Sequence, residues 1–207
     1  ARDRFGEKPL YYGIREGRFA FASELRPLRK VWNSRPADSP EAIGLFLRHG
    51  YIPSPLSIWD GVYKLPPGCW TVVRGADVRA GKVPQPIRYW SITEAVVAGH
   101  AKPFRGAAEE AREALRGLLE QSVRGQLLAD VPVGAFLSGG IDSSLIVSVA
   151  QRASNSPITT FSMGVADPRM DESAHAARIA EELGTEHHEF RVDGKAALEV
   201  VDQISDV

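Results

Sequence analysis

Cysteine is almost missing from this chain of 207 residues, in which Cys69 is the single example. One cysteine cannot form an internal disulfide, which suits a reducing compartment, and we expect a cytoplasmic protein. Long apolar runs are missing too: no stretch approaches the length of a membrane span, and the first residues lack the pattern of a signal peptide. A net charge of −1 excludes the basic surface that binds nucleic acid or anionic membranes.

The first part of the chain, residues 1–75, contains short runs of alternating apolar residues, which predict β-strands. Two short alternating runs, 10–14 and 18–22, flank a polar turn and predict a hairpin. The sequence Ser39-Pro40-Glu41 predicts a helix start with a serine N-cap, and this helix should end near Gly50.

Residues 53–67 contain four prolines and predict irregular loop. Strand character returns at 69–73, and a turn is expected at 74–77. Residues 76–104, rich in proline and glycine with little periodicity, predict a connector between two domains.

Residues 105–207 alternate between helix-like and strand-like segments. An amphipathic helix begins near residue 107. The alternation that follows is typical of βαβ units and predicts an α/β fold with a parallel sheet, which binds ligands beyond the carboxyl ends of its strands. The expected strands are 133–137, 158–163 and 187–192, and the expected helices are 143–152, 173–183 and 196–207.

The most informative segment is Ser138-Gly139-Gly140-Ile141-Asp142-Ser143-Ser144, at the first strand-to-helix turn of this part. A helix start leaves backbone N–H groups without partners and favours anions, and glycines let the backbone approach a ligand closely. Asp142 is the one negative group, so beside an anion it suits Mg²⁺. We therefore predict a phosphate site that uses magnesium.

Other phosphate loops do not fit this segment. It lacks the lysine of the P-loop and does not match G-x-G-x-x-G. The alternative without a ligand is a strand–turn–helix corner, with glycines for geometry and serines for capping.

The segment resembles the pyrophosphate loop, S-G-G-x-D-S, of the ATP pyrophosphatases, a group that includes GMP synthetase and NAD synthetase. Its surroundings narrow the resemblance to the glutamine-hydrolysing asparagine synthetases. The flanks that are similar to that family include 130–137, 161–164, 171–173 and 183–189, together with 2–12, 21–25, 50–53 and 64–68.

The resemblance implies two domains: a β-rich remnant of an N-terminal-nucleophile glutaminase in residues 1–75, and the N-terminal half of a Rossmann-like ATP-pyrophosphatase domain in residues 105–207. The implied reaction joins the aspartate β-carboxylate to AMP and releases pyrophosphate, and ammonia from glutamine then gives asparagine. The implied ligands are aspartate, glutamine or ammonia, ATP and Mg²⁺, and a homodimer is compatible with the family.

The resemblance also assigns site residues. Leu137 and Met163 match positions whose backbones contact adenosine, and Asp142 matches the position that holds Mg²⁺–pyrophosphate. The residues that match the pyrophosphate loop are Ser138, Gly139, Gly140, Asp142 and Ser143.

The chain departs from the family at the glutaminase nucleophile, which is a cysteine at the mature N-terminus, whereas this chain begins with Ala1. Cys69 is internal, and we expect it to pack like a small hydrophobe. We expect an internal fragment that does not complete the reaction by itself. Alternatives are a relative that acts on another carboxylate, in a β-lactam, peptide or glycan, and a non-catalytic nucleotide-binding module.

Three further groups have structural interpretations. His187 and His188 are adjacent on a strand, so they should face opposite sides and not share a metal. The acidic pair at 171–172 should favour the start of the next helix, and the alternative is a pair of acid–base groups that close over substrate. The basic residues Arg2, Arg4 and Lys8 are expected in a solvated loop.

Overall fold

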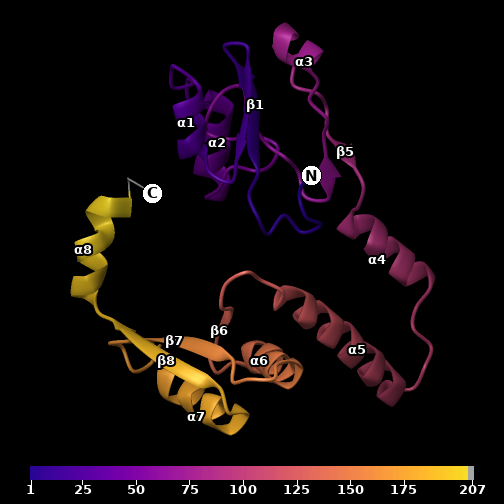
Figure 1. Ribbon diagram of the computed structural model, residues 1–207, viewed down its shortest axis with the longest axis vertical. Helices are drawn as coiled ribbons and strands as arrows, with labels where there is room; N and C mark the ends of the chain where they lie inside the picture. Colours follow the sequence, from indigo (N-terminus) through magenta and orange to yellow (C-terminus); the bar gives the residue numbers. More distant parts are fainter. Residues whose placement is uncertain (205–207) are drawn as a thin grey trace. The chain divides into compact units, whose positions relative to one another are not determined.

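The computed structural model describes residues 1–204, which fall into two compact units, one formed by Ala1–Pro103 and the other beginning at Phe104 (Figure 1). The fold is mixed α/β, with antiparallel sheets in the first unit and a parallel sheet in the second. No helix among the described residues combines the length and apolarity needed to cross a membrane.

The first unit is built on the predicted hairpin of β1 (Tyr11–Arg15) and β2 (Arg18–Ala22). Its two-residue turn has positive φ at Glu16 and Gly17, 53° and 69°, the turn geometry that matches the twist of the strands. The predicted helix is α2 (Pro40–His49), capped by the Ser39 hydroxyl and ended by a left-handed Gly50. Both predictions are confirmed.

A third strand joins this hairpin, which the proline-rich sequence of 53–67 did not predict. β3 (Val62–Lys64) pairs with β1 to give the order β2-β1-β3. The core between the sheet and α1 (Leu25–Val31) contains buried Leu28, Trp32 and Trp59.

Residues 74–103 contain more regular structure than their sequence suggested. The expected turn at 74–77 is wrong, because α3 (Gly75–Ala80) begins there. The predicted connector holds β5 (Ile87–Arg88), which pairs with β4 (Cys69–Trp70), and α4 (Ile92–Ala101). This segment belongs to the first compact unit, while the functional domain boundaries given above stay a prediction.

The second unit follows the predicted alternation. Its parallel sheet has the order β6-β7-β8, with Phe136 paired to Phe161 and Phe161 to His188. The predicted strands and helices are confirmed, with the end of the last helix, 205–207, outside the described residues. The elements are α5 (Ala108–Gln126), β6 (Gly134–Phe136), α6 (Ile141–Ala153), β7 (Thr159–Val165), α7 (Ser173–Leu183), β8 (Glu186–Val192) and α8 (Gly194–Ile204).

One face of the parallel sheet packs against α7, which runs along β7 and β8 in Figure 1, and α6 packs beside α7 and against Leu137 at the end of β6. Their contact is apolar and consists of Leu137, Val147, Ala176 and Ala180. The C-terminal part of α5 packs on α6 through Val123, although the predicted apolar stripe of α5 is otherwise largely exposed. These contacts fix α6 against α7 and α5, and with α6 the turn that precedes it.

Candidate functional site

The turn between β6 and α6, residues 138–144, is the candidate site, and we call it the β6–α6 loop. Leu137 anchors its start: the side chain is 1% exposed, and its N–H donates to the Phe161 carbonyl of β7 at 2.8 Å. Gly140 is the N-cap of α6. The loop therefore leaves the carboxyl edge of a parallel sheet and enters a helix, as the sequence predicts.

Serine hydroxyls close this loop. The Ser138 N–H donates to the Ser143 hydroxyl at 3.3 Å, and the two hydroxyl oxygens lie 3.0 Å apart. The Gly140 N–H donates to the Ser138 hydroxyl at 3.3 Å, and the Ser144 hydroxyl donates to the Gly140 carbonyl at 2.7 Å. The structure thus brings Ser138 and Ser143 together, in the way that the capping alternative also requires.

The two glycines differ in their surroundings. Gly139 has φ 81°, and a β-carbon built on it would lie 2.8 Å from Cδ2 of His175 and 3.2 Å from the Ala176 nitrogen. Gly140 has φ −70°, and its β-carbon would meet nothing closer than the Ser138 hydroxyl at 3.4 Å. Gly139 is thus required by both conformation and packing, whereas Gly140 is not.

Asp142 lies in the first turn of α6 and is exposed. It is the one carboxylate of the β6–α6 loop, at a helix start where the N–H groups have no intrahelical acceptors. Among the described residues there is no cluster of three or more side chains that could hold a metal. A single carboxylate fits Mg²⁺ that takes its other ligands from phosphate oxygens and water.

Leu137 directly follows β6, and Met163 lies in the second half of the neighbouring strand β7, two residues after the Phe161 carbonyl that accepts the Leu137 N–H. Their side chains differ: Leu137 is buried against α6 and α7, and Met163 is 61% exposed. The adenosine contacts expected from their backbones stay a prediction.

His175, which the sequence analysis did not single out, lies beside the loop. It is exposed in the first turn of α7, and its Nδ1 is 3.0 Å from an Nη2 atom of Arg178. Nothing local marks this histidine, because its proximity to Gly139 arises from the packing of α7 on the sheet.

The adjacent histidines of β8 face opposite sides of the sheet, as predicted. His187 points to the helix-covered face, where its ring nitrogens lie 2.9 Å from the Thr160 hydroxyl and 3.0 Å from the Ser162 hydroxyl. His188 stacks on Phe161 on the opposite face. The two rings therefore do not converge on one metal.

At the start of α7, Asp171 performs the predicted structural role. Its carboxylate accepts the Ser173 N–H at 3.0 Å. That N–H, and after it the Ser173 hydroxyl, lowers the pKa of the Asp171 carboxyl below its usual value. Glu172 occupies the N-cap position without a side-chain capping bond.

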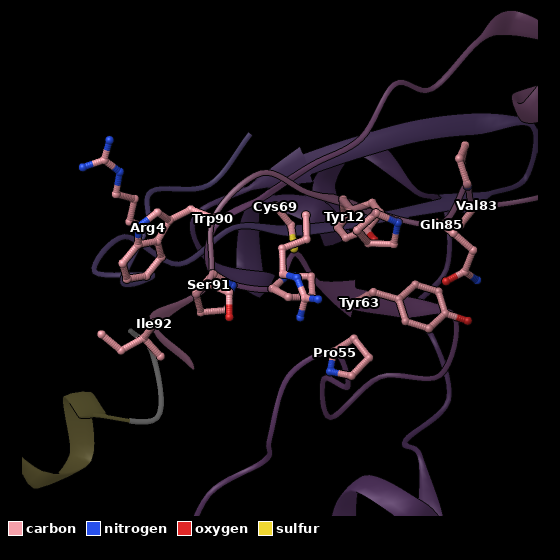
Figure 2. Close-up of a pocket in the computed structure, with 15 residues that line it drawn as sticks. Arg4, Tyr12, Pro55, Tyr63, Cys69, Val83, Gln85, Trp90, Ser91 and Ile92 are labelled. Atoms are coloured by element: carbon pink, nitrogen blue, oxygen red, sulfur yellow. The ribbon is translucent and has the colours of Figure 1, made fainter. Parts of the chain in front are cut away.

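A cavity of about 650 Å³ lies within the first unit, lined by Tyr12, Tyr63 and Cys69 among others (Figure 2). Cys69 is buried with Tyr12 and Leu65, as expected of a packed thiol. Apart from Cys69, this cavity contains none of the residues that the sequence singled out as chemically active. We therefore take the β6–α6 loop as the functional site.

For the basic residues near the N-terminus, the expectation of a solvated loop is wrong at Arg2. Arg2 is not a solvated loop residue: its guanidinium donates to the carbonyls of Lys8, Leu65 and Gly6 at 2.8, 2.8 and 2.7 Å. Its role is to hold the first residues against the chain before β4.

Comparison with known proteins decides the family. The model of the asparagine synthase family matches residues 114–207, which contain the β6–α6 loop, and the model of the glutamine amidotransferase domain matches residues 1–90. The chain belongs to the glutamine-hydrolysing asparagine synthetase family. The parallel sheet therefore lies in the synthetase-like part of the chain, and the antiparallel sheets lie in the glutaminase-like part.

Three relatives illustrate the match: two are named asparagine synthetases and one is named an amidase. A Methanocaldococcus jannaschii protein named "Putative asparagine synthetase (glutamine-hydrolyzing) 2" is 31% identical over 99% of this chain and 38% of its own length. Asparagine synthetase (glutamine-hydrolyzing) 1 of Bacillus subtilis is 34% identical over 90% of this chain and 27% of its own. A Gibberella zeae protein named amidase chry2 is 30% identical over 96% of this chain and 30% of its own. The chain thus spans well under half the length of these relatives.

Proposed function

We propose that the β6–α6 loop holds the β- and γ-phosphates of ATP, and that the chain supplies the nucleotide half of a site that adenylylates a carboxylate. The observation that carries the proposal is the loop itself. A helix start with unpaired N–H groups lies at the carboxyl edge of a parallel sheet, beside the single exposed carboxylate of Asp142. The match of residues 114–207 to the asparagine synthase family supports it.

Each loop residue has a distinct role in this proposal. The N–H groups of the first turn of α6 bind phosphate oxygens. The hydroxyls of Ser138 and Ser143, 3.0 Å apart, turn their hydrogens from each other and from the Gly140 carbonyl to the same phosphate oxygens. The Asp142 carboxylate holds Mg²⁺. When bound, Mg²⁺ neutralises phosphate charge and so favours departure of pyrophosphate.

The proposed reaction is the formation of asparagine. A β-carboxylate oxygen of aspartate attacks the α-phosphorus of ATP, the bond between the α-phosphorus and the bridging oxygen breaks, and pyrophosphate leaves. Ammonia from glutamine then displaces AMP. The chain's own contribution is to hold the leaving pyrophosphate and, through the backbones of Leu137 and Met163, the adenosine.

None of the residues in this chain is assigned to glutamine hydrolysis or to the acceptor pocket, so we expect the chain alone to bind ATP without making asparagine. Synthesis is tested on a longer protein that contains this sequence. Release of pyrophosphate should then require both aspartate and a nitrogen donor.

Calorimetric titration of the chain with ATP and Mg²⁺ tests the nucleotide site. We expect Asp142→Ala to weaken binding by about tenfold or more, since a ligand to the cation is lost. Glu181→Ala, which removes an exposed carboxylate of α7, is the matched control and should bind as the wild type does. Equal affinity for the wild type and Asp142→Ala would overturn the role of Asp142.

A second candidate keeps the nucleotide chemistry and changes the acceptor. Relatives named as amidases, 30% and 29% identical over 96% and 95% of this chain, favour it. In such a protein the activated carboxylate belongs to a β-lactam, peptide or glycan precursor. Pyrophosphate release by the longer protein, measured with aspartate and with these carboxylates in turn, separates the two candidates.

A further inference from the structure

A second group of donors lies next to the β6–α6 loop on a different helix. His175, in the first turn of α7, places the Cδ2 atom of its ring so close to Gly139 that a β-carbon there would be 2.8 Å away. The ring is exposed. The imidazole therefore borders the loop on the side open to solvent.

Arg178 determines which nitrogen of this ring carries hydrogen. A guanidinium donates hydrogen bonds and does not accept them, and Nη2 of Arg178 lies 3.0 Å from Nδ1 of His175. Nδ1 must therefore accept, which leaves the hydrogen of the neutral ring on Nε2. In an imidazole Nε2 is bonded to Cδ2, so this donor lies one bond away from the ring atom that would come nearest to a β-carbon on Gly139.

The charge of the loop gives this donor a use. Residues 138–144 include no lysine or arginine, and their one charged side chain is the carboxylate of Asp142. A bound pyrophosphate carries several negative charges, of which one divalent cation balances only a part. Arg178 places a positive charge beside His175, with Nη2 3.0 Å from Nδ1, and the Cδ2 atom of the same ring borders Gly139.

We propose that His175 is a phosphate-binding residue whose Nε2–H donates to a non-bridging oxygen of the pyrophosphate group, with Arg178 fixing the tautomer and adding charge. This inference rests on the proposed function of the β6–α6 loop and adds to it a contact from α7. It also explains why Gly139 must lack a side chain: a β-carbon would push the ring away from the loop.

Calorimetric titration of the chain with inorganic pyrophosphate and Mg²⁺ at pH 8 is the test. His175→Ala should bind about tenfold more weakly, which is the usual size of a hydrogen bond to a charged group. His175→Gln, whose amide can donate from nearly the same position, should recover most of that loss. Arg178→Leu should also weaken binding, because it removes both the charge and the constraint on the tautomer.

Long-range proton–nitrogen NMR of the wild type supplies a measurement that needs no variant. It should show hydrogen on Nε2 of His175, and the Nε2 resonance should move when pyrophosphate and Mg²⁺ are added. Hydrogen on Nδ1, or a resonance that does not move while the loop residues respond, would overturn the assignment.

The outcomes separate this inference from the function on which it rests. If the wild type and Asp142→Ala bind pyrophosphate and Mg²⁺ equally, or neither binds, the loop itself is not the site and both proposals fall. If Asp142→Ala loses affinity while His175→Ala binds as the wild type does, only the role of His175 is wrong.

Discussion

At the scale of single residues, adjacent glycines of the β6–α6 loop are under different constraints. Gly139 combines φ 81° with a β-carbon position that His175 and the Ala176 nitrogen would crowd, whereas Gly140 has φ −70° and more open surroundings. An L-residue in the left-handed region costs about 1–2 kcal/mol before any steric conflict is counted. Two adjacent glycines, identical in the sequence, thus differ in whether the structure tolerates a side chain at their position.

This difference predicts the stabilities of two alanine variants. Gly139→Ala should lower the free energy of unfolding by about 2 kcal/mol or more, because strain and overlap with His175 add. Gly140→Ala should change it by less than about 1 kcal/mol. Urea unfolding followed by circular dichroism compares them, since all four tryptophans lie in the first unit. Equal stabilities would contradict the described backbone.

Asp3 provides a prediction about pH. Its carboxylate accepts the N–H groups of Phe5, Glu7 and Lys8, and the bond from Glu7 is the main cause that lowers the pKa of this carboxyl. A carboxyl whose pKa is lower when folded stabilises the fold above its unfolded pKa, about 3.9, and loses that contribution as pH falls through the folded value.

The stability of the first unit, followed by tryptophan fluorescence in urea, should therefore decrease from about pH 5 toward pH 2. Asp3→Asn should be less stable at pH 6 and should decline less on acidification. Asp130→Asn, an exposed change in the second unit, should follow the wild type. A pH profile that Asp3→Asn leaves unaltered would show that these hydrogen bonds do not contribute.

At the scale of elements, the sequence predicted the helices and strands that have a clear periodic pattern of apolar residues or clear capping residues. The hairpin, α2 with its Ser39 cap and Gly50 end, and the alternation of the second unit all have such signals. The missed strands β3 and β5 have three and two residues, too few to show a period of two. They form because partner strands far along the chain lie beside them, which a local pattern does not contain.

The residues of the candidate site also fall into two groups, those that a local motif reveals and those that only the packing reveals. The β6–α6 loop is contiguous, so its residues could be found from a motif. His175 could not, because it reaches Gly139 only through the packing of α7 against the sheet. The helix α4 was missed because its apolar residues do not gather on one face, and none of its residues is buried in the structure.

The packing under the loop predicts a specific loss. Leu137 is 1% exposed and joins Val147, Ala176 and Ala180, so Leu137→Ala should destabilise the second unit by about 2–5 kcal/mol. Leu128→Ala, at a side chain that is 89% exposed, should cost less than about 0.5 kcal/mol. Circular dichroism in urea measures both, and similar losses would place Leu137 outside the core.

At the scale of the whole molecule, the exposed aromatic side chains on one face of the parallel sheet are the most unusual feature of the described residues. They include Phe136 and Phe190, which are 84% and 57% exposed, with Phe161 in ring contact with both. Parallel sheets are normally covered on both faces. An apolar surface of this kind tends to become buried against another molecule.

We therefore expect the isolated chain to self-associate as its concentration rises. Replacing Phe136 and Phe190 with serine should shift the population toward the monomer, because both are exposed and add apolar area to the contact. Phe5→Ser, which changes an exposed phenylalanine of the first unit, is the control and should leave the association unchanged. Sedimentation velocity that finds a monomer at all concentrations would contradict this expectation.

The central claim is that the β6–α6 loop holds the terminal phosphates of ATP through a divalent cation at Asp142. The most direct measurement is a crystal structure of the chain with ATP and Mn²⁺, in which anomalous scattering locates the metal. We predict a peak about 2–2.5 Å from an Asp142 carboxylate oxygen, with phosphate oxygens on the N–H groups of the first turn of α6. Triphosphate density elsewhere, with no metal at Asp142, would contradict the claim.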